Sequence, residues 1–101
     1  MHIEEAVHGG ERVLAISGQI DSSTSAELEK RLTELLDGGV KEFILDFNNV
    51  DYISSAGLRV LVKAMKEIKH LQGKMCIRAV KDYIMEVFEI SGLTSFFTIS
   101  A

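Results

Sequence analysis

The chain has 101 residues, of which 47% are hydrophobic and 26% are charged, and its formal net charge is −4 at pH 7. This length suits one small domain with one hydrophobic core, and the composition excludes a largely disordered chain. A net negative charge argues against nucleic-acid binding, which needs clustered lysine and arginine. No apolar stretch reaches the ~18 residues of a spanning helix, and the N-terminus lacks the pattern of a signal peptide. We therefore expect a cytoplasmic protein with no membrane contact.

The N-terminal segment predicts a β-hairpin. Two short apolar runs within residues 3–17 flank Gly9 and Gly10. Adjacent glycines supply the positive φ angles of a tight turn, so the first strand is expected to run antiparallel to the second.

A helix is predicted within residues 19–39 by the spacing of four leucines along one face. Asp21 and the serine cluster mark its start, and Thr24 with Glu27 can form a capping box. Gly38 and Gly39 can close its end. The predicted apolar face carries Leu28, Leu32, Leu35 and Leu36.

The rest of the chain alternates predicted strands and helices. Residues 42–47 are short and rich in aromatic and branched apolar residues, which predicts a strand buried on both faces. Helical spacing follows from Ser55 to Gly73, then a strand over 74–80, a short helix within 81–92 and a last strand over 95–99. The predicted order is ββαβαβαβ. Strand-helix-strand units require right-handed crossovers, so we predict an α/β fold with a mixed, mostly parallel sheet and helices packed against it.

The segment NNVDYISSAG, residues 48–57, is predicted to be a loop at the carboxyl end of a strand, where functional sites of such folds gather. Ser54 or Ser55 can cap the following helix, with small residues after it for close packing. The alternative is that one serine is a phosphorylation site. A helix N-terminus tolerates a phosphate, whereas the added charge and bulk would disturb a partner bound over the loop.

The run LDFNNVDYISSAGLRVL, residues 45–61, resembles the signature of the STAS-domain family of anti-sigma factor antagonists: an apolar strand, a few turn residues, then D-S-[ST]-[AG]-G-L opening a helix. GQID at 18–21 resembles the family's G-x-[IL]-D before its first helix, and ISGL at 90–93 resembles the end of its last helix. The resemblance covers essentially the whole chain and implies one STAS domain over residues 1–101.

By that resemblance, Ser55 occupies the position of the family's phosphoserine. The family's usual aspartate before it is Ser54 here, which makes Ser54 a rival site, and Ala56 stands where a hydroxyl residue often follows. Asp21 is expected at the same edge of the domain as the two serines, either as a cap of the first helix or as part of the binding surface.

The resemblance further implies a partner-switching protein that performs no chemistry and has no cofactor or metal of its own. Its unmodified form binds an anti-sigma factor that is also a serine kinase, which supplies ATP and magnesium, and this binding releases the kinase's client. Phosphorylation weakens the complex and a metal-dependent PP2C-type phosphatase restores it. We expect a monomer that pairs transiently. The expected contact residues are Asp21, Ser22, Ser23, Ser54, Ser55, Ala56, Gly57, Leu58, Arg59 and Lys63.

Three other functions fit the sequence less well. An enzyme is disfavoured because Ser55 lacks the G-x-S-x-G elbow and the histidines lack partner or metal-ligand spacing. A phosphoacceptor receiver domain is disfavoured because no acidic pair follows an early strand. A STAS scaffold in a larger signalling or transport complex, without a phosphorylation switch, remains the alternative.

Overall fold

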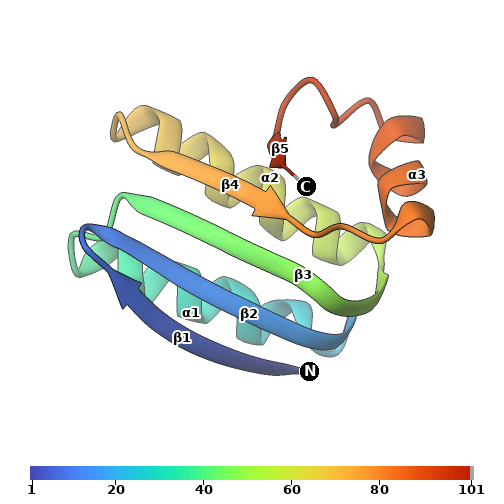
Figure 1. Cartoon of the computed structure of the whole chain (residues 1–101), viewed down its shortest axis with the longest axis horizontal. Coiled ribbons are helices and arrows are strands. Elements are labelled where there is room, and N and C mark those ends of the chain that lie inside the picture. Colours follow the sequence, from blue (N-terminus) through green and yellow to red (C-terminus); the bar gives the residue numbers. More distant parts are fainter. Residues whose placement is uncertain (101) are drawn as a thin grey trace.

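The computed structural model describes residues 1–100 (Figure 1). The elements in chain order are β1 (His2–His8), β2 (Glu11–Ile20), α1 (Ser25–Asp37), β3 (Glu42–Ile53), α2 (Ser55–His70), β4 (Lys74–Arg78), α3 (Asp82–Ile90) and β5 (Thr98–Ser100). This confirms the predicted order ββαβαβαβ. None of the helices in these residues is both long and apolar enough to cross a bilayer.

The five strands form one sheet in the order β1-β2-β3-β4-β5. β1 and β2 pair antiparallel through the predicted turn, in which Gly9 has a φ of +61°. The other pairs are parallel, which confirms the mixed, mostly parallel sheet. Because β2 and β3 are parallel, their carboxyl ends lie at the same edge of the sheet, where α1 and α2 begin.

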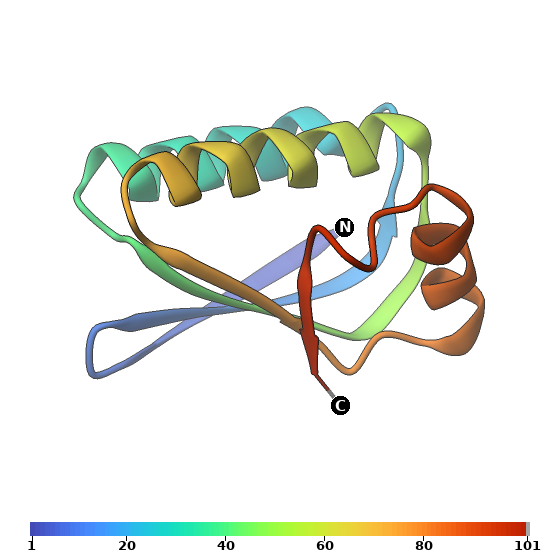
Figure 2. The same ribbon diagram turned by 90° about the horizontal axis from the view of Figure 1, so that it is seen from above.

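Helices α1 and α2 lie side by side on one face of the sheet (Figure 2). The chain passes from β2 through β3 to β4 in one direction across the sheet, and right-handed crossovers in one direction place their helices on one face. The prediction that β3 is buried on both faces is therefore wrong. Phe43, Leu45 and Phe47 are buried beneath the helices, whereas Ile44 and Asp46 between them are only partly buried.

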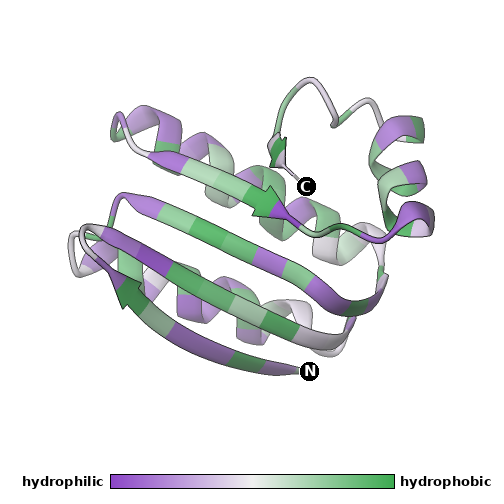
Figure 3. Ribbon diagram, in the orientation of Figure 1, coloured by the Kyte–Doolittle hydropathy of each residue, from purple (hydrophilic) through white to green (hydrophobic). Residues whose placement is uncertain are grey.

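The core lies between the sheet and the two long helices. The leucine face predicted for α1 is buried, and it meets the apolar side of α2 and the inward residues of β2, β3 and β4. Figure 3 shows runs of hydrophobic residues in the three central strands, which hydrophilic residues interrupt along β3. Burial of this apolar surface is the main force that holds the layers together.

Several predicted strand boundaries are wrong. β2 runs on to Ile20 rather than ending by residue 17, and β4 ends at Arg78 rather than at residue 80. β3 continues through residues 48–53, which were predicted to be a loop, because the long β2 offers pairing partners up to Ile20, beyond register irregularities near Ser17 and Gly18. β5 is shorter than predicted and begins at Thr98. Phe97 instead lies in the preceding turn, buried against Phe88 with ring centroids 5.6 Å apart.

Candidate functional site

The two adjacent serines have different positions at the start of α2. Ser54 is the N-cap residue, with extended backbone angles, and its Oγ accepts a hydrogen bond from the Gly57 amide at 3.2 Å. The Ser54 carbonyl accepts the Leu58 amide at 2.9 Å. Ser54 is therefore the capping serine, satisfying one of the amides that a helix start leaves without an intrahelical acceptor.

Ser55 is the first residue of α2 and its side chain is exposed. Within residues 1–100, no side chain or backbone group forms a hydrogen bond with its Oγ. The following Ala56 is small and partly buried, and the first turn carries no acidic residue. The Ser55 hydroxyl is thus open to an approaching partner and has no structural hydrogen bond to lose.

Gly57 fixes how closely α2 approaches the sheet. A Cβ at this position would lie 2.8 Å from Ile20 Cγ2, 2.9 Å from Ile53 Cγ1 and 3.0 Å from the Ile20 carbonyl oxygen. These separations are too short for any side chain. The glycine therefore allows the first turn of α2 to rest directly on the ends of β2 and β3.

Asp21 organises the other loop at this edge. One oxygen of its carboxylate, Oδ1, accepts the Ser23 amide at 2.9 Å, the Ser23 hydroxyl at 2.7 Å and the Thr24 amide at 3.1 Å. These donors, the Ser23 hydroxyl first among them, hold the pKa of Asp21 below its ordinary value. Asp21 thus shapes the start of α1 through its own turn while remaining partly exposed.

The predicted capping box of Thr24 and Glu27 does not form. Thr24 is at the N-cap position, but its side chain makes no capping hydrogen bond. Its hydroxyl instead donates to the Gln19 carbonyl at 2.8 Å and accepts from the Asp21 amide at 2.9 Å. The turn made by Asp21 competes for the hydroxyl and turns it away from the helix.

The two loops lie next to each other. Ile20 and Ile53 are paired across β2 and β3, and each directly precedes a loop of the site. The Ser54 amide donates to the Ile20 carbonyl at 2.8 Å. This edge of the sheet therefore brings together the predicted groups Asp21–Ser23 and Ser54–Leu58, although about thirty positions separate them in the sequence.

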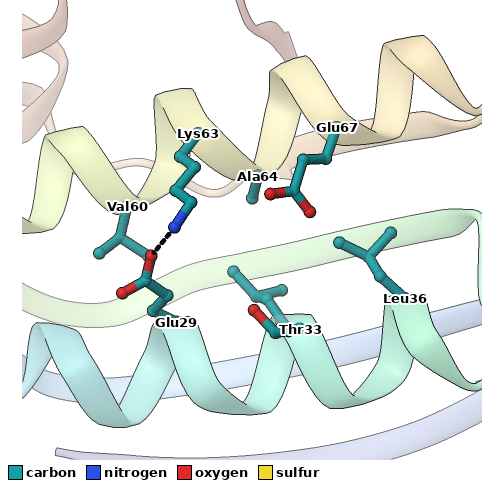
Figure 4. Close-up of a pocket in the computed structure, with 8 residues that line it drawn as sticks. Glu29, Thr33, Leu36, Val60, Lys63, Ala64 and Glu67 are labelled. Carbon is teal, nitrogen blue, oxygen red and sulfur yellow. Dashed lines mark hydrogen bonds and ion pairs between the residues drawn. The ribbon is translucent and has the colours of Figure 1, made fainter.

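The predicted cations of α2 differ in their surroundings. Arg59 is exposed one turn after Ser55. Lys63 is two turns away and reaches across to α1, where its Nζ lies 2.8 Å from Glu29 Oε2 (Figure 4). The hydrogen bond to Glu29 raises the pKa of Lys63. Lys63 thus joins the two helices across a groove lined on the α2 side by Val60 and Ala64, rather than standing free beside the serines.

A further ion pair near this edge was not predicted. Lys81, just before α3, places its Nζ 2.7 Å from Asp51 Oδ1 near the end of β3. The hydrogen bond to Asp51 raises the pKa of Lys81. Tyr52 and Tyr83, beside this pair in the sequence, are 49% and 51% exposed. Lys81 and Asp51 are thirty positions apart, so no local sequence pattern predicts their contact and it is seen only in the folded structure.

Residues 2–101 match the STAS domain. The chain belongs to the STAS domain family, which confirms the resemblance.

Relatives within this family share a description. BtrV of Bordetella bronchiseptica, described as a putative anti-sigma factor antagonist, is 36% identical over 91 residues, which cover 90% of this chain and 78% of BtrV. The anti-sigma-B factor antagonist of Staphylococcus aureus is 33% identical over 78 residues, covering 77% of this chain and 72% of that protein. Among solved structures, the Bacillus cell fate determinant SpoIIAA in its phosphorylated form has a similar fold, with a TM-score of 0.78 at 18% identity over 99% of this chain and 92% of that one.

Proposed function

We propose that this chain is an anti-sigma factor antagonist whose docking is controlled by phosphorylation of Ser55. Unmodified, it binds an anti-sigma factor that is also a serine kinase and thereby releases that kinase's client. The kinase transfers a phosphoryl group from magnesium-bound ATP to Ser55 Oγ, and a PP2C-type phosphatase later removes it. The shared description of the sequence relatives supports the antagonist role. The phosphorylated form of SpoIIAA supports a modification in a protein of the same fold.

The observation that carries this proposal is the difference between Ser54 and Ser55. The cap hydrogen bond belongs to Ser54, and the exposed Ser55 hydroxyl has no partner within residues 1–100. A phosphate on Ser55 leaves the cap in place and is favoured at a helix N-terminus by roughly 0.3–1 kcal/mol. The same group adds about −1.5 to −2 charges to the surface that a partner would cover. Modification would therefore change binding more than folding.

The magnitude is sufficient for a switch. One unit charge placed ~4 Å from a like charge costs about 4 kcal/mol at an effective dielectric constant near 20, before screening by salt. A loss of ~2.7 kcal/mol already lowers affinity about a hundredfold. The phosphate thus needs only one close acidic neighbour in the complex to release the partner.

The proposed docking surface consists of the two adjoining loops and the start of α2. We place Asp21, Ser22 and Ser23 on one side and the run from Ser54 to Arg59 on the other. Lys63 belongs to the rim, because its charge is shared with Glu29. Residues 1–101 act here as one domain and bind as a monomer.

The test uses phosphorylation by the anti-sigma factor kinase that binds this chain. The protein, Ser55→Ala and Ser54→Ala are each incubated with the kinase, ATP and magnesium, and the product is mapped by mass spectrometry. We expect one phosphate on Ser55 in the parent and in Ser54→Ala, and none in Ser55→Ala. Phosphate on Ser54 would move the site by one residue. A kinase that binds the chain and modifies neither serine, while active on another substrate, would instead support the scaffold function.

A further inference from the structure

Arg59 differs from the other arginines, Arg12, Arg31 and Arg78, because it forms no ion pair within residues 1–100. Its helical neighbours at three and four positions are Ser55, Ala56, Val62 and Lys63, and none is acidic. Within residues 1–100 no carboxylate lies within ion-pair distance of its guanidinium, whereas Lys63, the next cation on α2, is paired with Glu29. The exposed guanidinium is therefore available to a new anion.

The helix directs Arg59 towards Ser55. Both residues are exposed and lie four positions apart, so their side chains share one face of α2. Side chains of a helix lean towards its N-terminus, and the Arg59 side chain thus extends over the turn that begins with Ser55. An acidic group four positions before a cation is also the favoured order for such a pair.

We propose that phosphoserine at position 55 forms an ion pair with Arg59. This deepens the proposed function and rests on it, because it concerns the state that the kinase produces. A guanidinium can bind two phosphate oxygens at once, which a lysine cannot do. The pair withdraws Arg59 from the docking surface at the moment when the phosphate is added. The modification therefore removes a cation from that surface as well as adding an anion.

Other charged groups near the phosphate are already engaged. The Asp21 carboxylate is held by Ser23 and Thr24, and Asp51 is held by Lys81. Lys63 is directed to Glu29 on the neighbouring helix. Arg59 is the cation whose position on α2 matches Ser55 and which has no competing partner in the part of the chain that the structure describes.

The experiment installs phosphoserine at position 55 during translation, so that no kinase is needed. The second pKa of the phosphate is measured by phosphorus NMR in three proteins: the parent with Arg59, the Arg59→Gln variant and the Lys63→Gln variant. The Arg59 Nε proton signal is followed in the same titration. We expect the phosphate pKa to be about 0.3 lower in the parent than in Arg59→Gln, and Lys63→Gln to match the parent. The Nε signal should move as the phosphate ionises.

An equal phosphate pKa in the parent and in Arg59→Gln, with a stationary Nε signal, would overturn the ion pair. So would a shift as large in Lys63→Gln as in Arg59→Gln, because it would indicate a general field of the helix. Failure of the kinase to modify Ser55 would count against the proposed function alone, since the installed phosphoserine reports on the pair independently.

Discussion

The Ser54 amide donates a hydrogen bond to the Ile20 carbonyl at 2.8 Å, and this bond joins the start of α2 to the end of β2. Ile20 directly precedes Asp21, so the bond also fixes the spacing between the two loops of the proposed docking surface. The site therefore depends on the sheet edge for its shape. Substitutions at this edge should distinguish residues that stabilise the fold from residues that bind the partner.

Replacing Ser54 by alanine should destabilise the protein without removing the phosphorylation site. The substitution deletes the acceptor of the Gly57 amide, which costs about 1 kcal/mol of unfolding free energy for a typical cap. In a domain of this size, that lowers the melting temperature by roughly 4–8 °C. Thermal unfolding followed by circular dichroism measures the change. Ser22→Ala removes an exposed hydroxyl that forms no hydrogen bond within residues 1–100, so this variant should melt with the parent. Equal stability of all three proteins would contradict the capping role.

Replacing Gly57 by alanine should be harmful even though alanine favours helices. The new Cβ would lie 2.8 Å from Ile20 Cγ2 and 3.0 Å from the Ile20 carbonyl, so α2 must move away from the sheet. We expect a loss of about 1–3 kcal/mol in urea unfolding and weaker binding of the kinase. Gly10→Ala serves as the matched control, because its Cβ would meet nothing closer than 3.6 Å. A Gly57→Ala protein as stable as Gly10→Ala would show that the close approach has no energetic importance.

Replacing Ser55 by aspartate should weaken kinase binding and leave the fold intact. A negative charge in the first turn of α2 is stabilising by roughly 0.3–1 kcal/mol, so the melting temperature should stay level or rise slightly. Ser91→Asp is the control of opposite sign: Ser91 is the C-cap of α3, where a negative charge meets the negative end of the helix and should lower the melting temperature. Calorimetry measures the melting temperature of both variants, and titration with the kinase measures their affinity. A large melting loss in Ser55→Asp would instead mean that the Ser55 side chain is structural.

The ion pair between β1 and α1 should make stability depend on pH in the acid range. Arg31 donates to both oxygens of the Glu5 carboxylate and Arg12 contacts it from β2, which together hold the pKa of Glu5 below its ordinary value of 4.5. A lowered carboxyl pKa contributes stability that is complete above the unfolded pKa and is lost as the pH falls through the folded pKa.

The stability difference between the parent and Glu5→Gln should therefore be constant above about pH 5 and shrink below 4.5. Urea unfolding between pH 7 and pH 3 measures it. Glu11→Gln, an exposed substitution on β2 outside this ion pair, should run parallel to the parent throughout. A difference for Glu5→Gln that stays constant down to pH 3 would contradict a role for the ionised carboxylate.

Much of the fold could be predicted from local pattern. The leucine spacing of α1 and the apolar stripe of α2 are local properties, so both helices and the buried faces they present were correct. The hairpin at Gly9 was correct because a positive φ is a property of one residue. The order of strands and helices came from the same local patterns, and the right-handed crossover rule then predicted the mostly parallel sheet.

The two loops of the candidate site could be picked out as segments of the sequence, but their contacts could not be predicted. The run from Ser54 to Leu58 was proposed because the small residues and the helix start are contiguous in sequence. The choice of Ser54 as the cap could not be made, because either serine suits the position. The hydrogen bond from the Thr24 hydroxyl to the Gln19 carbonyl was not predicted. It depends on the turn at Asp21, which forms only in the folded chain and which engages the hydroxyl that a capping box would need.

The sequence by itself determined which elements form, in what order, and which short segment combines exposed hydroxyls with the smallest residues, because each of these depends on neighbours along the chain. The tertiary structure decided that both long helices cover one face, that β3 runs on to Ile53, and that Lys63 and Lys81 are engaged with Glu29 and Asp51. Those outcomes depend on the direction of each crossover and on side chains thirty or more positions apart. The interactions that stabilise these arrangements form only when the chain is folded.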